Sequence, residues 1–155
     1  MEIKVYKQNR RLEVVDQNKV IKEYHVSLGL NPIGPKTEEG DNKTPEGEYI
    51  LDDANSQSNY YYAFHISYPT EKQKWKARLK GKNPGGNIML HGYPNQLSEI
   101  DYWITKMSLQ NEAEEKVRAM MPEYDWTNGC IALLNSEIDE IKALIKVPTK
   151  ITIYP

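Results

Sequence analysis

The single cysteine of the chain, Cys130, follows Asn128-Gly129 and precedes the apolar run 131–134. A glycine permits a tight turn with a positive φ angle, and the apolar run enters the core, so Cys130 lies where a turn meets the interior. Consecutive backbone N–H groups around such a turn can converge and stabilise an oxyanion. Free cysteine is also among the most frequently buried residue types. Cys130 alone is therefore compatible with a nucleophile and with an inert core residue.

A nucleophilic thiol needs a base, because its ordinary pKa of ~8.5 leaves little thiolate at neutral pH. The sequence offers three histidines. His65 lies in the middle of an expected strand, so we expect a sheet histidine with its hydrogen bonds satisfied. His25 lies on a strand face of mixed character, so we expect it to be structural or exposed. His91 instead ends the apolar run 88–90 and precedes Gly92, which would place its ring at a strand end facing a cleft. His91 is the candidate base.

Two other chemistries fit these residues less well. A zinc site built from the three histidines and Cys130 lacks any short C-x-x-C or H-x-x-x-H pair, so we expect no metal and no other cofactor. The basic stretch EKQKWKARLKGK, residues 71–82, is short and typical of a solvated helix face. With a formal net charge of −2, the chain has no global preference for nucleic acid or an anionic membrane.

The remaining residues predict a sheet that would hold the cysteine and the histidine. A chain of 155 residues suits one domain with a sizeable core. Alternating apolar patterns predict strands over residues 3–5, 12–14, 20–30, 47–51, 60–69, 87–93 and 149–155. Helices are expected after a Thr70 cap, over 97–121 and after a Ser136 cap. The predicted fold class is α+β, mainly β, in a single domain spanning residues 1–155.

Two further segments bear on function and location. Residues 29–50 carry four glycines and three prolines, which exclude a helix and a central strand. Loops of this length in compact domains are often functional. No apolar stretch approaches the ~18 residues of a membrane span, and the first residues, MEIKVYKQNRRLEVV, lack the apolar centre of a signal peptide. The protein is therefore either cytoplasmic or has lost a leader.

The motifs IMLHGY, residues 88–93, and DWTNGCIAL, residues 125–133, together resemble the signature of the L,D-transpeptidase catalytic domain, a family that remodels bacterial peptidoglycan. That signature has His-Gly at a strand end, then Ser or Thr two residues before Gly-Cys, then an apolar continuation. GDNKTPEGEY, residues 40–49, resembles the family's GD-x-x-T-P-x-G-x-Y loop. Residues 24–32 and 135–154 also fit in the family's order, so the resemblance covers nearly the whole chain.

The order of the two residues and the position of the last arginine argue against three other classes of cysteine enzyme. Papain-like and NlpC-like peptidases place the cysteine before the histidine, whereas His91 precedes Cys130 here. Sortases share the His-then-Cys order but need an arginine after the cysteine, and the last arginine of this chain is Arg118. The sortase interpretation therefore fails.

The resemblance implies a β-sandwich-like catalytic fold with short flanking helices and a helical insertion before the cysteine, at about residues 95–122. It implies that Cys130 attacks a stem tetrapeptide and releases D-alanine, leaving a thioester acyl-enzyme. His91 would move the proton, oriented by the backbone carbonyl of Gly92. Backbone N–H groups of Gly129 and Cys130 would hold the oxyanion. The acyl group would pass to an amine of a second stem, to a lipoprotein or to water.

Several residues are candidate substrate contacts within this resemblance, and they are Lys36, Thr44, Tyr93, Trp126, Thr127 and Asn128. Asn128 stands where the family often has a second histidine, and Ala132 where an Asn or Arg is common. Both departures leave the Cys-His pair intact and bear on substrate preference. The insertion is either a helical decoration packed on the domain or a lid over the cleft, with Tyr93, Tyr102 and Trp103 lining it. We expect a decoration or cleft wall in preference to a mobile lid.

Three functions remain open on the sequence. The leading one is a cysteine L,D-transpeptidase, whose Cys130 a carbapenem should acylate. An L,D-carboxypeptidase or amidase of the same fold would use water as the acceptor. A non-catalytic peptidoglycan-binding module is disfavoured because both Cys130 and His91 are present. Because peptidoglycan lies outside the cytoplasmic membrane, we expect export to the periplasm or cell wall, with the leader absent from this sequence. The expected partners are stem peptides of peptidoglycan and no nucleic acid, and the expected state is a monomer.

Overall fold

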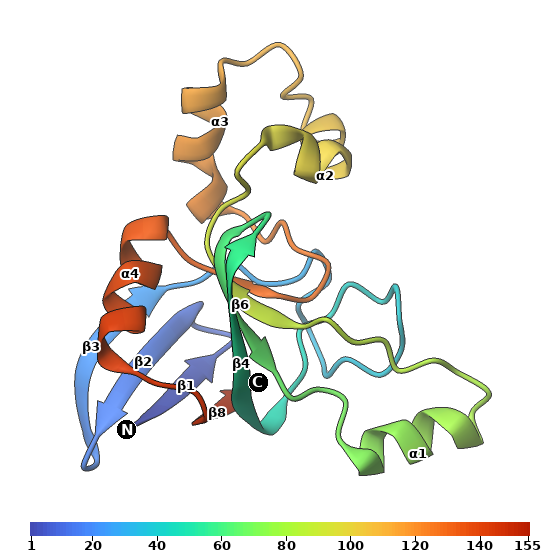
Figure 1. Ribbon diagram of the computed structural model, residues 1–155. Helices are drawn as coiled ribbons and strands as arrows, with labels where there is room; N and C mark the ends of the chain where they lie inside the picture. The colour runs from blue at the N-terminus through green and yellow to red at the C-terminus, as the bar shows by residue number, and fades with distance from the viewer.

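The body of the protein is one eight-stranded sheet with the strand order β3-β2-β1-β8-β4-β5-β6-β7 (Figure 1). This computed structural model describes residues 1–155, apart from the side chains of Tyr102, Trp103 and Lys106. The strands are β1 (Glu2–Tyr6), β2 (Arg11–Asp16), β3 (Lys19–His25), β4 (Gly47–Ser58), β5 (Tyr61–Ile66), β6 (Met89–His91), β7 (Ile131–Ala132) and β8 (Thr149–Tyr154). Two neighbouring pairs, β1 with β8 and β6 with β7, are parallel. The other neighbours are antiparallel.

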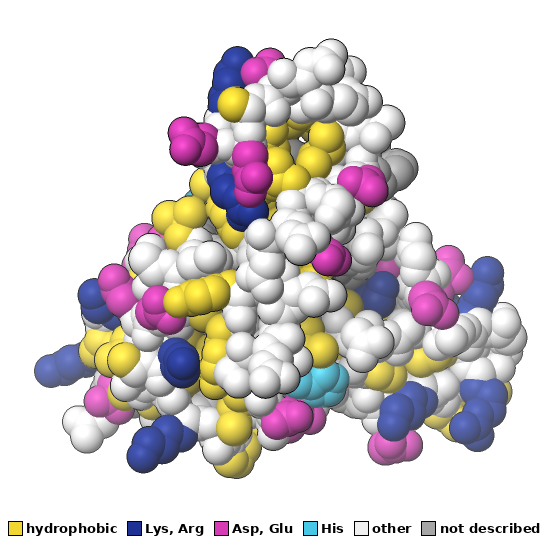
Figure 2. All heavy atoms as spheres, turned by 45° about the horizontal axis from the view of Figure 1, so that its top comes forward, with side chains coloured by type: hydrophobic (Ala, Val, Ile, Leu, Met, Phe, Trp, Pro, Cys, Tyr) yellow, Lys and Arg dark blue, Asp and Glu magenta, His cyan; other side chains and the backbone are white. Residues whose placement is uncertain are grey.

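Helical segments lie around this sheet, and they are α1 (Glu71–Leu79), η1 (Leu97–Ile100), α2 (Asp101–Lys106), α3 (Glu114–Met120), η2 (Met121–Glu123) and α4 (Asn135–Leu144). Figure 1 shows α1 projecting to one side and α2 and α3 standing together at the top. Hydrophobic side chains are visible inside this upper helical part in Figure 2. Within the part of the chain that the structure describes, no helix is long and apolar enough to cross a membrane.

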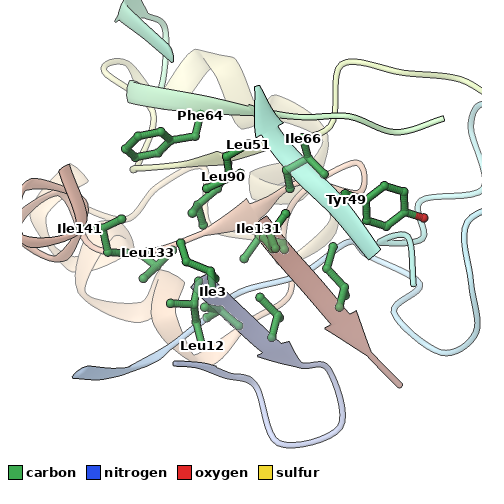
Figure 3. Packing of buried hydrophobic residues seen from close by; sticks show 14 of the residues in the cluster. Ile3, Leu12, Tyr49, Leu51, Phe64, Ile66, Leu90, Ile131, Leu133 and Ile141 are labelled. Carbon is green, nitrogen blue, oxygen red and sulfur yellow. The ribbon is translucent and has the colours of Figure 1, made fainter. Parts of the chain in front are cut away.

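The sheet curls so that its two halves face each other across the main core. The residue pair Ser27 and Ala132 forms an isolated bridge between the segment after β3 and β7, which brings the two ends of the sheet together. Buried side chains from both halves fill the interior, for example Ile3 from β1 and Leu90 from β6 (Figure 3). The predicted mainly-β, sandwich-like fold with short helices is confirmed.

Helix caps agree with the sequence at one helix and not at another. The Thr70 hydroxyl accepts a hydrogen bond from Gln73 N–H, and the Gln73 side chain accepts one from Thr70 N–H, which confirms the predicted cap of α1. The predicted Ser136 cap is wrong, because α4 already begins at Asn135. The Glu137 carboxylate reaches back to Leu134 N–H, at 3.0 Å, and caps the helix two residues earlier than expected.

Strand β4 is longer than its apolar pattern predicts. The alternation ends at Leu51, but the strand continues to Ser58 because its polar residues pair with β5. Most side chains beyond Leu51 are exposed, so no hydrophobic signal marks this half of the strand. The β4–β5 hairpin tip that results, residues 55–60, reaches the cavity described below.

The long loop between β3 and β4 has no regular structure, yet buried charges fix it. Lys7 is 2% exposed, and its ammonium donates to the carbonyls of Gly34 and Thr44, each at 2.8 Å, and to Glu46 at 3.0 Å. A second buried lysine, Lys36, binds Asp41 at 2.8 Å. The Asp41 carboxylate also accepts three backbone N–H groups of the same loop. Polar contacts therefore replace the apolar packing that this segment lacks.

Candidate active site

Cys130 opens on a cavity of about 820 Å³. It directly precedes β7, and its Sγ accepts a hydrogen bond from Met89 N–H at 3.4 Å and donates to the carbonyl of Asn87 at 3.5 Å. Burial raises the pKa of the Cys130 thiol to about 11, although the Met89 N–H acts in the opposite direction. The resting thiol is therefore protonated at neutral pH, and it needs a base before it can attack.

The turn that presents Cys130 can be made only by glycine. Gly129 has a φ angle of +135°, and a Cβ at this position would lie 2.7 Å from the carbonyl oxygen of Lys43. The backbone of the turn therefore touches the long loop directly. This contact sets the cysteine at the boundary between the loop and β7.

His91 is the last residue of β6 and opens on the same cavity. Its Nδ1 lies 2.6 Å from the carbonyl oxygen of Gly92. Because a carbonyl only accepts hydrogen bonds, the neutral ring carries its proton on Nδ1 and leaves the Nε2 lone pair free. Burial lowers the pKa of His91 to about 4, against the opposing effect of the Gly92 carbonyl. The ring is neutral at pH 7 and can accept a proton.

Neighbouring parallel strands bring the two residues together. Leu90 stands opposite Ile131, and His91 stands opposite Ala132. Cys130 therefore lies one step before the paired region, beside Met89, whose side chain shares a sheet face with that of His91. Among the described side chains no hydrogen bond joins the thiol to the imidazole, since Sγ is held by Met89 and Asn87. Such contacts commonly tighten only when substrate binds.

Two aromatic rings enclose His91. The ring centroids of His91 and Tyr60 are 4.6 Å apart, and those of His91 and Trp126 are 5.8 Å apart. Both aromatic residues also line the cavity. They keep water from the imidazole, which is the physical source of its low pKa. Trp126 was predicted from the sequence, whereas Tyr60 was missed because nothing in the run YYYAF distinguishes a cavity-lining tyrosine from a strand tyrosine.

Thr127 holds the shape of the cysteine turn. Its hydroxyl accepts a hydrogen bond from Gly129 N–H at 3.1 Å and donates to the carbonyl of Cys130 at 2.7 Å. The Gly129 N–H, expected from the sequence to stabilise an oxyanion, is therefore committed to Thr127. Thr127 lines the cavity, but both of its hydroxyl hydrogen bonds lie within the turn.

The other predicted contacts divide into two groups. Asn128 and Lys36 line the cavity, although the Lys36 ammonium is already bonded to Asp41 and to the carbonyl of Glu38. The structure does not bring Thr44 and Tyr93 to this cavity. Thr44 is fully buried, and its hydroxyl accepts Gly29 N–H at 3.0 Å.

Tyr93 lies instead in an apolar cluster behind the cavity wall. It lines a separate hollow of about 40 Å³ and packs on Trp126 with ring centroids 5.9 Å apart. The side chains of Tyr102 and Trp103, predicted to line the cleft, lie outside the described residues. Glu99 and Ile100 of η1 do line the cavity. This part of the helical segment forms a wall beside the cysteine and the histidine.

Comparison with known proteins gives a consistent family. The chain matches the YkuD family, the L,D-transpeptidase catalytic domain, over residues 1–153. It is 29% identical over 96 residues to YafK of Escherichia coli K12, whose name assigns it provisionally to the L,D-transpeptidases; this match covers 58% of the chain and 37% of YafK.

Two solved structures share the fold over almost the whole chain. The helical cell shape determining protein Pgp2 of Campylobacter jejuni is 25% identical with a TM-score of 0.65, and the match covers 97% of this chain and 46% of Pgp2. Bd1075 of Bdellovibrio bacteriovorus is 27% identical with a TM-score of 0.63, and the match covers 99% of this chain and 47% of Bd1075. The chain thus spans less than half the length of these relatives. It belongs to the family of L,D-transpeptidase catalytic domains.

Proposed function

We propose that this chain is a cysteine L,D-transpeptidase that acts on tetrapeptide stems of peptidoglycan. One observation carries the proposal: the Cys130 thiol and the His91 imidazole open on one cavity, and the Nδ1 contact with Gly92 leaves Nε2 free to act as the base. Family membership supports the substrate class. Peptidoglycan lies outside the cytoplasmic membrane, so the periplasm or cell wall is the proposed location.

The proposed reaction begins from a neutral pair. Nε2 of His91 takes the thiol proton while Sγ of Cys130 bonds to the peptide carbonyl carbon. The tetrahedral intermediate collapses as its C–N bond breaks, and the imidazolium gives the same proton to the departing D-alanine amine. Because burial lowers the pKa of His91, its imidazolium is a strong acid and releases this proton readily. With Gly129 N–H committed to Thr127, the backbone N–H of Cys130 is the proposed oxyanion donor.

The lining of the cavity supports a peptide substrate. Side-chain amides and a hydroxyl line the cavity on which the cysteine opens, and they come from Asn42, Asn55, Gln57, Ser58, Asn59, Asn87 and Asn128. Such groups donate to and accept from the backbone of an extended peptide without requiring a charged ligand. Transfer to water in place of an amine uses the same acyl-enzyme, so an L,D-carboxypeptidase or amidase is the second candidate. An amine on a lipoprotein is a further candidate acceptor.

Incubation with a purified tetrapeptide muropeptide, followed by mass spectrometry, tests the proposal. A crosslinked dimer supports transpeptidation, a tripeptide supports hydrolysis, and unchanged substrate contradicts both. Cys130→Ala should abolish every product, and it should also abolish the mass increase that a carbapenem produces on the folded protein. His91→Gln should lower turnover by about 10²- to 10⁴-fold, the usual contribution of a positioned general base.

A further inference from the structure

Asn135, the first residue of α4, reaches the strand end that carries His91. Its Oδ1 accepts a hydrogen bond from Tyr93 N–H at 2.8 Å. The same oxygen lies against Gly92, where a Cβ would come within 2.5 Å of it. Asn135 therefore contacts the backbone directly behind the histidine. It is not among the residues that line the cavity.

This contact continues a chain of hydrogen bonds that starts at the imidazole. The Gly92 carbonyl, which accepts the His91 Nδ1–H at 2.6 Å, belongs to the same peptide group as Tyr93 N–H. The path therefore runs from Nδ1–H to a carbonyl, through one planar peptide group, and from its N–H to Asn135 Oδ1. Gly92 N–H is held in turn by the carbonyl of Tyr60 at 3.0 Å. Both sides of Gly92 are fixed.

We propose that Asn135 is a positioning residue for His91, acting through the Gly92–Tyr93 peptide; this inference rests on the proposed function. An acceptor on the peptide N–H fixes the plane of the peptide and so the direction of the Gly92 carbonyl. Successive hydrogen bonds polarise one another, so the same acceptor also strengthens the carbonyl as a partner for Nδ1–H. Asn135 thereby favours the tautomer with a free Nε2 and stabilises the imidazolium that forms during attack.

Three variants distinguish a hydrogen-bond acceptor at position 135 from a side chain that only fills space there. Asn135→Leu keeps the branched shape at Cγ and removes the acceptor, whereas Asn135→Asp keeps an acceptor oxygen and adds negative charge. Ser136→Ala, at the exposed next residue, is the matched control. The charged groups that share the cavity with His91 are Lys36, Glu39 and Glu99. They are unchanged in every variant, so differences report the side chain at position 135.

Alkylation by iodoacetamide provides a readout that needs no substrate, because Cys130 is the only cysteine. The rate between about pH 3 and 9, a window that includes the lowered pKa of His91 at about 4, reports how readily His91 removes the thiol proton. We expect Asn135→Leu to be about 10-fold slower at pH 7, the order of one lost hydrogen bond. The alkylation rate of Asn135→Asp at pH 7 should stay within about threefold of that of the parent protein. The part of its pH–rate profile that depends on His91 should move to higher pH. Ser136→Ala should match the parent protein.

Thermal unfolding of each variant and muropeptide turnover complete the experiment. A folded Asn135→Leu with an unchanged alkylation profile overturns the proposal. The proposal is also overturned if the Leu and Asp variants lose the same fraction of the alkylation rate and that loss parallels a fall in their melting temperatures. Such a pattern would mark a purely structural role. If Asn135→Leu does not fold, Asn135→Ala takes its place against Asn135→Asp. The alkylation rates could differ among the variants as expected while the parent protein turns over no muropeptide. That result would contradict the proposed function and leave the positioning role intact.

Discussion

The two walls of the cavity are held in place by different forces. On one side, the loop between β3 and β4 is anchored by the buried ammonium groups of Lys7 and Lys36. On the other side, the helical segment 97–123 packs through an apolar cluster that includes Val117, Met121 and Trp126. A polar anchor is directional and fixes individual backbone groups, whereas apolar packing fixes a surface and tolerates adjustment. We therefore expect the loop wall to fix the positions of individual backbone groups beside the cavity. The helical wall should fix only the outline of the cavity surface and should tolerate small adjustments.

The largest effect is expected for Lys7→Met. This change leaves Glu46 and the carbonyls of Gly34 and Thr44 without their shared donor, so we expect a loss of about 4 kcal/mol in the free energy of unfolding. Urea denaturation measures it. Lys4→Met, at a half-buried lysine of β1, the strand that ends just before Lys7, is the control and should change stability by less than about 1 kcal/mol. Equal losses in the two variants would contradict a polar anchor.

Met121→Ala tests the helical wall. Met121 is fully buried, so truncation should cost about 3 kcal/mol through lost burial and the cavity left behind. The partly buried Met120 provides the matched control, Met120→Ala, with a smaller expected loss. Limited proteolysis of the Met121→Ala variant should cut first within residues 97–123 and leave the loop wall intact. First cleavage within residues 26–46 would mean that the two walls are not independent.

Acid should weaken the folded protein through His91. Its pKa in the folded state is about 4, below the ordinary 6.5, so the unfolded chain binds more protons between these values. Stability is therefore retained above pH 6.5 and falls as the pH drops from 6.5 towards 4, by up to about 3 kcal/mol. Unfolding curves at several pH values measure this slope. His91→Gln should flatten it, because the group whose pKa differs between the folded and unfolded states is then gone.

The smallest effect is expected at the outer surface of the helical wall. Glu114 pairs with Arg118 one turn later on α3, at 2.8 Å, and its side chain is 60% exposed. Glu114→Gln should therefore cost no more than about 0.5 kcal/mol and less at high salt. Chemical denaturation at two salt concentrations provides the measurement. A loss above 1 kcal/mol would show that charge, as well as apolar packing, holds this wall.

The parts of the fold and of the candidate site that the sequence predicts are those marked by local patterns. Cys130 and His91 stand next to glycines at the ends of apolar runs, and Thr70 precedes a helix with its capping partner three residues on. Lys7 carries no such mark, because a lysine at the end of a strand pattern is normally solvated. Nor does Asn135, whose partner Tyr93 is 42 residues away along the chain.

The backbone N–H of Gly129 shows a second limit of prediction from residue order. Residue order suggests that the N–H groups of a glycine-cysteine turn are available. The Thr127 side chain takes one of them, and the direction of a hydroxyl cannot be read from spacing. The exposed half of β4 was missed for a related reason, since pairing with β5 extends the strand without any apolar residue to signal it.

The parallel pairing of β6 with β7 also has a consequence for how the protein folds. Parallel neighbours cannot be joined by a hairpin, so residues 92–130 must cross over before the two strands meet. Closing a connection of that length costs chain entropy, and contacts so distant in sequence form slowly. Cys130 and His91 lie at the two ends of this crossover. A nascent chain would therefore not bring Cys130 and His91 together until late in folding, and burial of the Cys130 thiol should lag behind recovery of the β1–β2 hairpin during refolding.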